Sequence, residues 1–154
     1  MRIMTLLIIH QAPKILLAMK KEGFGVGRWN GFGGKVKEGE TIEQTMLREL
    51  KEESGLVISD FKKKGLFKFS FPNPDIDCEV HVFKANQFEG EPRETDEMRP
   101  QWFDENKIPY DEMWSDDRHW LPLFLAGKTL KGEFFFDEND QLIRHRLEEV
   151  ENLN

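Results

Sequence analysis

The order of apolar and polar positions along the chain predicts a set of short β-strands. Apolar runs at residues 3–9 and 15–19 are separated by a turn that contains Pro13, so we expect them to form adjacent strands. Residues 78–85 alternate in polarity, and a proline-containing turn joins them to an aromatic run at residues 65–71, which predicts a hairpin. The strands expected in the whole chain are residues 3–9, 15–19, 65–71, 78–85, 101–104, 132–136 and 142–147.

A helix is expected over residues 42–54. Thr41 and Gln44 have the spacing of a capping box, in which the two residues satisfy free backbone N–H groups of the first turn, and Gly55 supplies the left-handed conformation that commonly ends a helix. At about 100° per residue, the apolar side chains of this helix form one stripe, which consists of Ile42, Met46, Leu47 and Leu50. With a second helix expected at residues 115–127, the elements predict a mixed α+β fold.

The acidic residues of the first helix cluster on one surface. Glu49 precedes Glu52 by three positions and Glu53 by four, so the three side chains are neighbours on the helix. Glu53 also falls beside the apolar stripe, whereas an ordinary solvated face would lie opposite it. Because like charges at this spacing repel one another, a bound metal ion is the simplest explanation for the cluster.

The segment before this helix is rich in glycine. Glycines recur through residues 20–35 and free the backbone to turn sharply and to approach a ligand. The segment is not a P-loop, because Val36 rather than Ser or Thr follows Lys35 and because Trp29 occupies the position of the first required glycine. Lys20 and Lys35 flank the loop and are candidate phosphate contacts. An ordinary surface lysine is the alternative interpretation for each.

Composition narrows the class of protein. A chain of 154 residues predicts a single domain, residues 1–154. The net charge of −7 disfavours a nucleic-acid polymer as the partner. Cys78 is the only cysteine, so the chain forms no internal disulfide and a reducing compartment is favoured, with the cytoplasm expected and mitochondrial or nuclear fractions left open. The apolar run at residues 3–9 is too short to cross a membrane, and we expect no membrane partner.

A longer pattern runs through the glycine-rich segment and the first helix. Gly34 is followed after five residues by Glu40 and after seven more by RELKEESGL at residues 48–56. This pattern resembles the Nudix box, and by it the chain is identified as a member of the Nudix family. Similarity to the branch of that family that hydrolyses oxidised purine nucleoside triphosphates extends over residues 27–36, 96–100 and 114–117. The resemblance implies a Nudix fold, with a central mixed β-sheet sandwiched between helices and additional β-hairpins.

The resemblance also implies a metal site. Mg²⁺ is expected, with Mn²⁺ able to replace it, because Mg²⁺ takes hard oxygen ligands and bridges readily to substrate phosphates. The implied ligands are the backbone carbonyl of Gly33 and the carboxylates of Glu49, Glu52, Glu53 and Glu97. The same four glutamates and Arg48 form the expected catalytic set. Arg48 is expected to orient the acids, and the general base is left open between Glu49 and Glu97.

A second set of residues is expected to bind the substrate. Every purine offers a flat face on which an aromatic side chain can stack. Core packing is the ordinary interpretation of any single aromatic residue, but Trp114 is an exception because its segment resembles the base-recognition loop of the family. Cys78 and Ile76 are expected at the pocket rim. The expected substrate-binding residues are Thr5, Lys20, Phe24, Asn30, Phe32, Gly33, Gly34, Lys35, Phe69, Phe71, Trp114, Ser115, Asp116 and Asp117.

Asp116 and Asp117 allow two interpretations. At the start of the second predicted helix they are typical acids of a first helical turn, which the helix dipole stabilises. The resemblance instead implies base recognition. Two close carboxylates in an apolar pocket do not easily both ionise, so one can donate a hydrogen bond while the other accepts. Such a pair would let one pocket accept both oxidised guanine and oxidised adenine.

The function implied by the resemblance is Mg²⁺-dependent hydrolysis of oxidised purine nucleoside triphosphates by a monomer. The substrates would be 8-oxo-dGTP, 2-hydroxy-dATP, 8-oxo-dATP and methylated purine triphosphates, and the products a nucleoside monophosphate and pyrophosphate. This reaction removes mutagenic nucleotides before a polymerase incorporates them. One alternative is the same chemistry on a dinucleotide polyphosphate. Another is a non-catalytic nucleotide-binding module, against which the intact Glu49, Glu52 and Glu53 argue.

Overall fold

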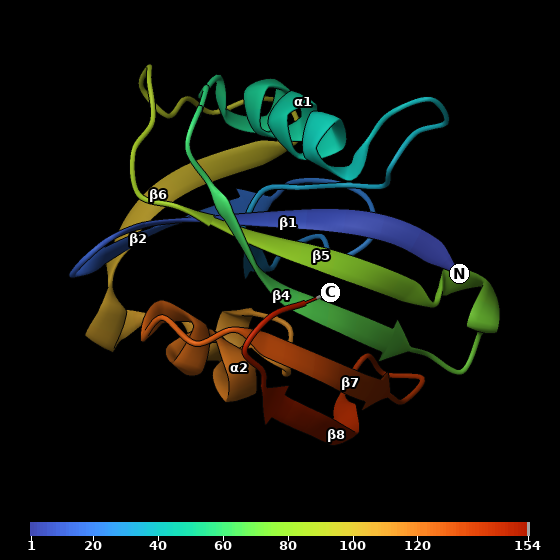
Figure 1. Ribbon diagram of the computed structural model, residues 1–154. Coiled ribbons are helices and arrows are strands. Elements are labelled where there is room, and N and C mark those ends of the chain that lie inside the picture. Colours follow the sequence, from blue (N-terminus) through green and yellow to red (C-terminus); the bar gives the residue numbers. More distant parts are fainter. Residues whose placement is uncertain (154) are drawn as a thin grey trace.

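A mixed eight-stranded β-sheet forms the centre of the protein (Figure 1). The computed structural model describes residues 1–153. The strands are β1 (Arg2–Gln11), β2 (Lys14–Lys20), β3 (Trp29–Asn30), β4 (Lys62–Ser70), β5 (Cys78–Ala85), β6 (Met98–Asp104), β7 (Leu130–Phe136) and β8 (Leu142–Glu149). The helices are α1 (Ile42–Ser54), α2 (Asp117–Leu125) and three 3-10 turns at Pro74–Ile76, Glu105–Lys107 and Tyr110–Glu112.

The strand order is β3-β2-β1-β5-β4-β7-β8, with β6 paired to β2. The expected hairpins are confirmed, since β1 with β2, β4 with β5, and β7 with β8 are all antiparallel. The pairs β1 with β5 and β4 with β7 are parallel, and these long-range pairings make the sheet mixed. The α+β prediction is therefore confirmed.

Two strands differ from the sequence prediction. The short strand β3 was not expected, and it pairs only with Ala18 and Met19 of β2. Strand β6 begins at Met98 rather than at residue 101. Its earlier start includes Pro100, which cannot donate to a strand ladder, but β6 pairs with β2 alone, and an edge strand tolerates proline.

Helix α1 has the ends that the sequence predicts. The Thr41 side chain accepts a hydrogen bond from the Gln44 N–H, and the Gln44 side chain accepts one from the Thr41 N–H, so the capping box is complete. Gly55 ends the helix with φ of 80°, in the left-handed region. Met46 and Leu50 of the apolar stripe are fully buried against the sheet.

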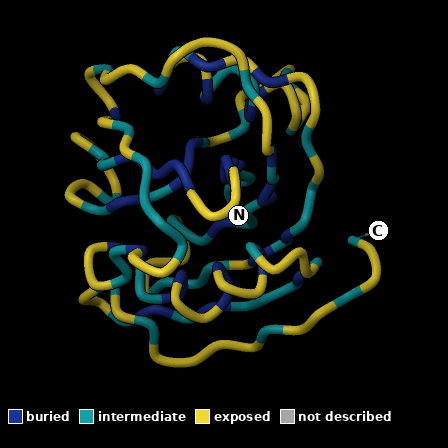
Figure 2. Tube along the Cα trace, turned by 90° about the vertical axis from the view of Figure 1, so that its left-hand side faces the viewer, coloured by how far each residue is buried: buried dark blue, intermediate teal, exposed yellow. Residues whose placement is uncertain are grey.

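The sheet has an apolar core on each face. Because side chains alternate along a strand, Leu7 of β1 belongs to the core under α1, whereas Ile8 belongs to the core that contains Trp120 and Phe124 of α2. The two helices thus cover opposite faces of the sheet (Figure 1). Buried segments run through the middle of the molecule and exposed loops surround them (Figure 2).

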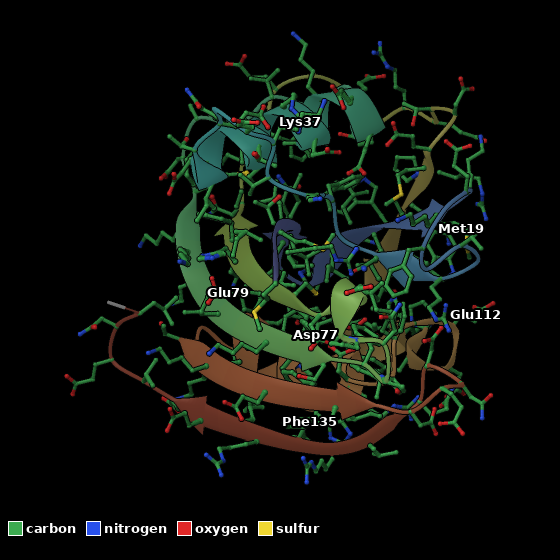
Figure 3. All side chains as sticks on the ribbon, turned by 90° about the vertical axis from the view of Figure 1, so that its right-hand side faces the viewer. Met19, Lys37, Asp77, Glu79, Glu112 and Phe135 are labelled. Carbon is green, nitrogen blue, oxygen red and sulfur yellow. The ribbon has the colours of Figure 1, made fainter. Side chains whose placement is uncertain are left out.

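The closing hairpin, which comprises β7, β8 and the turn between them, lies far from α1. Figure 3 shows Phe135 on this hairpin and Lys37, in the loop before α1, at the other end of the molecule. Helix α2 begins two residues later than expected, at Asp117, because Ser115 and Asp116 form the connection that leads into it. Neither α1 nor α2 is long and apolar enough to span a membrane, and the same is true of every other helix within residues 1–153.

Candidate active site

Three carboxylates converge beside α1. Glu49 and Glu53 come from the helix, and Glu97 comes from the loop before β6; one oxygen from each lies within 4.8 Å of the others. Thr95 holds this loop in place, because its hydroxyl donates to the Glu53 carbonyl and accepts from the N–H groups of Glu97 and Met98. The structure therefore brings Glu97 to the helix, as the resemblance implied. Sequence reasoning did not identify Thr95.

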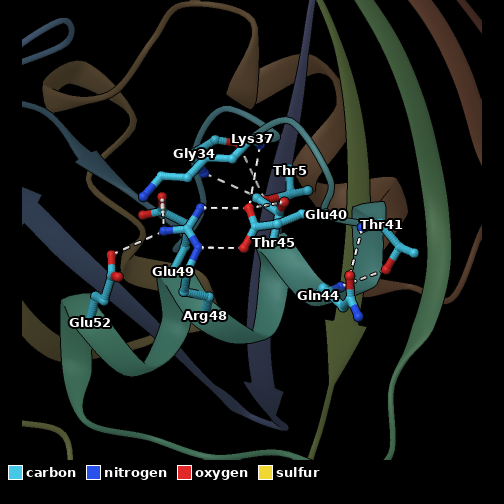
Figure 4. A network of polar contacts seen from close by, with 10 residues as sticks. All are labelled: Thr5, Gly34, Lys37, Glu40, Thr41, Gln44, Thr45, Arg48, Glu49 and Glu52. Carbon is cyan, nitrogen blue, oxygen red and sulfur yellow. Dashed lines mark hydrogen bonds and ion pairs between the residues drawn. The ribbon is translucent and has the colours of Figure 1, made fainter.

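Arg48 connects the acids of this region (Figure 4). Its Nε and Nη2 donate to both oxygens of Glu40 at 2.7 and 3.0 Å, and its Nη1 donates to Glu49 at 3.0 Å and to Glu52 at 3.1 Å. The hydrogen bonds from Arg48 lower the pKa of Glu40 to about 2. Arg48 thus holds a fixed position between acids, which agrees with the orienting role expected for it.

Glu52 lies differently from the other acids of α1. Its carboxylate pairs with Arg48 and its side chain is 48% exposed, whereas that of Glu49 is 14% exposed. Glu52 is not one of the three carboxylates that converge, so the structure separates it from Glu49, Glu53 and Glu97. Its expected role as a metal ligand stays a prediction.

Gly33 and Gly34 bring the loop backbone against the acids. The Gly33 N–H donates to Glu53 Oε1 at 2.9 Å. A Cβ on Gly33 would lie 1.9 Å from the Thr5 carbonyl oxygen of β1, so this position requires glycine. A Cβ on Gly34 would lie 2.7 Å from the Glu49 carboxylate carbon, so a side chain there would displace that carboxylate.

The three converging acids suit a divalent cation. Burial and the neighbouring charge of Glu49 raise the pKa of Glu53 to about 8, and burial likewise raises the pKa of Glu49. Carboxylates that repel one another in a partly buried place are stabilised when a cation lies between them. Oxygen donors of this kind are the ligands that Mg²⁺ and Mn²⁺ prefer. The residues present therefore fit such an ion.

A cavity of about 150 Å³ opens next to the acids and contains most of the residues expected to bind substrate. A cavity of about this size holds a planar aromatic ring in another protein. Its lining includes the expected residues Thr5, Lys20, Phe24, Asn30, Gly33, Gly34, Phe69, Phe71, Trp114, Asp116 and Asp117, together with Glu53 and the rim residue Cys78. One cavity thus joins the acid cluster to an aromatic pocket.

Asp116 and Asp117 are buried in this cavity, with exposed fractions of 3% and 4%. Asp116 Oδ2 accepts a hydrogen bond from Trp120 Nε1 at 2.8 Å, whereas Asp117 Oδ2 has no hydrogen-bond partner. Burial raises the pKa of Asp116 to about 6, and burial together with Asp116 raises the pKa of Asp117 well above its usual value. The Asp116 side chain makes no hydrogen bond that caps α2. The pair therefore faces the cavity, where burial favours the neutral, protonated carboxyl.

Three residues expected at the substrate site lie elsewhere. Phe32 is fully buried in the core under α1, because it bridges to Leu7, whose side chain points to that face. Lys35 lines a separate surface depression near Arg2. The Ser115 hydroxyl accepts a hydrogen bond from the Leu142 N–H at 2.9 Å. Ile76, expected at the rim, is also not among the lining residues.

Several lining residues were not identified from the sequence. Met4 and Leu6 of β1 share the cavity face because they lie two positions apart in a strand, and this alternation was a usable signal. Trp120 and Phe136 come from α2 and β7, and no sequence spacing connects those elements to the glycine loop. Their part in the pocket follows only from the tertiary fold.

A mixed sheet between helices, with converging acids on α1, defines the class of this protein. The NUDIX domain profile matches residues 2–124, and the chain therefore belongs to the Nudix family. It is 52% identical over 152 residues to the oxidized purine nucleoside triphosphate hydrolase of Danio rerio, covering 99% of this chain and 97% of that protein. It is 47% identical to the Mus musculus protein of the same name, covering 97% and 96%.

The fold also resembles that of a solved bacterial protein. A MutT protein from Bacillus halodurans superposes with a TM-score of 0.84 at 27% identity, and the match covers 96% of this chain and 98% of that one. Nudix hydrolases use a divalent metal ion, and the acid cluster of Glu49, Glu53 and Glu97 supplies a site of suitable chemistry for it.

Single substitutions will show which glutamates of α1 contribute to metal binding. We expect Glu53→Gln to weaken Mn²⁺ binding by at least about tenfold and Glu52→Gln by less than about threefold, because only Glu53 belongs to the converging set. Isothermal titration of the folded proteins with Mn²⁺ measures both, and circular dichroism verifies folding. Equal losses in the two variants would make Glu52 an equal ligand and contradict this distinction.

The buried aspartate pair predicts a dependence of stability on pH. A carboxyl whose pKa is raised in the folded state stabilises the protein below its unfolded pKa, near 3.8, and this contribution is lost as pH rises through the folded pKa. The folded pKa is about 6 for Asp116 and is raised well above the usual value for Asp117. We therefore expect Asp117→Asn to gain stability relative to the wild type by about 1–2 kcal/mol between pH 5 and pH 7. Urea unfolding at each pH measures this difference. A difference that stays constant with pH would show that the pair is ionised.

Proposed function

We propose that this protein hydrolyses oxidised purine nucleoside triphosphates to the nucleoside monophosphate and pyrophosphate, using Mg²⁺. The observation that carries the proposal is that one cavity is lined both by Glu53 of the acid cluster and by the buried Asp116–Asp117 pair. A modified purine nucleoside triphosphate matches this combination, because its phosphates suit the cation site and its base suits the aromatic and polar pocket. The names of the relatives from Danio rerio and Mus musculus support the same substrate class.

The phosphate end of the substrate would lie at the acid cluster. Glu49, Glu53 and Glu97, with the Gly33 carbonyl and Glu52 as further candidates, would hold the ion. When bound, it would neutralise phosphate charge and activate the attacking water. Glu97 is exposed, and Arg48 binds only Oε1 of Glu49. Each carboxylate therefore keeps an oxygen that can accept the proton of the water. Lys20, which also lines the cavity, offers a charge for the phosphates.

The base end would lie among the aromatic residues. Trp114, Phe24 and Phe71 offer faces on which a purine stacks, with roughly 1–3 kcal/mol per base. Asp117 Oδ2 lacks a partner and is available to the edge of the base, as a donor when protonated and as an acceptor when ionised. Asn30 adds a polar side chain to the same cavity. We infer that the proton shared by the aspartate pair adapts the pocket to oxidised guanine and oxidised adenine.

A substrate screen tests the proposed reaction. Pyrophosphate release would be measured with Mg²⁺ on 8-oxo-dGTP, 2-hydroxy-dATP, 8-oxo-dATP, a methylated purine triphosphate, dGTP, dATP and a dinucleotide polyphosphate. We expect kcat/KM for the oxidised purines to exceed that for dGTP and dATP by at least about tenfold. Glu53→Gln serves as the control for contaminating activity. A higher kcat/KM for the dinucleotide polyphosphate would instead support that alternative substrate, and binding without turnover would support a non-catalytic module.

The aspartate pair can be tested separately. Asp116→Asn and Asp117→Asn each fix an amide where the wild type can move a proton, so we expect each variant to change the ratio of kcat/KM for 8-oxo-dGTP and 2-hydroxy-dATP by about tenfold or more. In the wild type, kcat/KM for both substrates should fall as pH rises through the raised pKa of the pair, because the donor is lost. Unchanged selectivity in both variants would contradict the role of the shared proton.

A further inference from the structure

Arg28 lies against Trp114 but does not line the cavity. Its guanidinium carbon is 4.2 Å from the centroid of the Trp114 ring, a cation–π contact, and its side chain is 28% exposed. Trp114 itself lines the cavity, and Arg28 does not. The Arg28 side chain therefore reaches the cavity through its contact with Trp114.

Arg28 is in turn paired with the turn of the closing hairpin. Its Nη2 lies 4.0 Å from Asp140 Oδ2. Asp140 has φ of 59° and is the one residue other than glycine that has positive φ within residues 1–153. This conformation is unfavourable for most residues and persists when the surroundings enforce it. Here the Asp137 carboxylate accepts hydrogen bonds from the N–H groups of Asn139 and Gln141 and fixes the turn on both sides of Asp140.

The same hairpin reaches the Trp114 segment at a second point. The Leu142 N–H donates to the hydroxyl of Ser115, which follows Trp114 directly. The glycine loop also lies close to Trp114: a Cβ added to Gly25 would be 3.1 Å from Trp114 Nε1. The Arg28 N–H also donates to the Gly25 carbonyl at 3.2 Å. Trp114 is therefore held by the loop, by Arg28 and, through Ser115 and Asp140, by the hairpin.

We propose that Arg28, anchored by Asp140, is a positioning residue that fixes the plane of Trp114 for stacking on the substrate base. This inference rests on the proposed function. A planar guanidinium covers an indole more completely than an ammonium does and is less free to move. Fixing Trp114 before the base arrives lowers the entropy lost on binding and therefore strengthens binding. The acid cluster does not contact Arg28, so the chemical step is left unchanged.

The test compares Arg28 with a matched cation–π pair elsewhere. Arg144 of β8 lies over Phe135, with its guanidinium carbon 4.3 Å from the ring centroid. Phe135 lies on the closing hairpin (Figure 3). We expect Arg28→Met to raise KM for 8-oxo-dGTP, and Kd for the product 8-oxo-dGMP, by about fivefold with kcat within about twofold of the wild type. Arg28→Lys keeps the cation but not the planar guanidinium, so it should recover only part of the loss. Arg144→Met should leave KM and Kd unchanged.

Asp140→Gly supplies a variant in which misfolding is not expected. Glycine adopts positive φ without strain, so the turn should keep its shape while the carboxylate is removed. We expect KM to rise by about twofold, in the same direction as Arg28→Met. Equal KM and Kd in Arg28→Met, Arg144→Met and the wild type would overturn the inference. An inactive wild-type protein would overturn the proposed function instead, so the two failures are distinguishable.

Discussion

The structure depends on the crowding of carboxylates at one edge of α1. Glu49, Glu53 and Glu97 approach one another closely although they carry like charge, and Glu53 is buried as well. Their arrangement is compensated by the Gly33 N–H and by Arg48, which is itself neutralised by Glu40. This compensation is incomplete, since the pKa of Glu53 remains raised. The remaining cost of burial and like-charge repulsion is relieved when a cation lies between these carboxylates.

The Asp116–Asp117 pair also places two carboxylates close together in a buried position, but its charge is compensated differently. Within residues 1–153 no ion pair joins it to a basic side chain, and Asp116 accepts a hydrogen bond from the neutral Trp120. Because burial disfavours charge, protonation relieves the cost of burying this pair. The acid cluster and the aspartate pair thus differ in the positive species that each requires, although both contribute to one cavity. A ligand with phosphates and a polar ring fits both requirements at once.

Local sequence signals predicted the parts of the protein that local interactions determine. The capping box, the Gly55 terminus and the hairpins depend on residues near one another in the chain, and these predictions were correct. Phe32 was assigned to the substrate site, but the face on which it lies is set by its pairing with Leu7, which sequence spacing does not reveal. Ser115 was expected to contact substrate because of the family resemblance, and its hydrogen bond with Leu142 of a distant strand was likewise not visible in the sequence.

The contribution of the closing hairpin follows from these distant contacts. The NUDIX domain match ends at residue 124, inside α2, before β7 and β8 begin. The alignments with the Danio rerio and Mus musculus relatives, in contrast, cover 99% and 97% of this chain. The hairpin supplies Phe136 to the cavity and holds the Trp114 segment through Asp140 and Leu142. The segment matched by the NUDIX profile thus carries the acids, whereas the hairpin that follows it supports the aromatic side of the cavity.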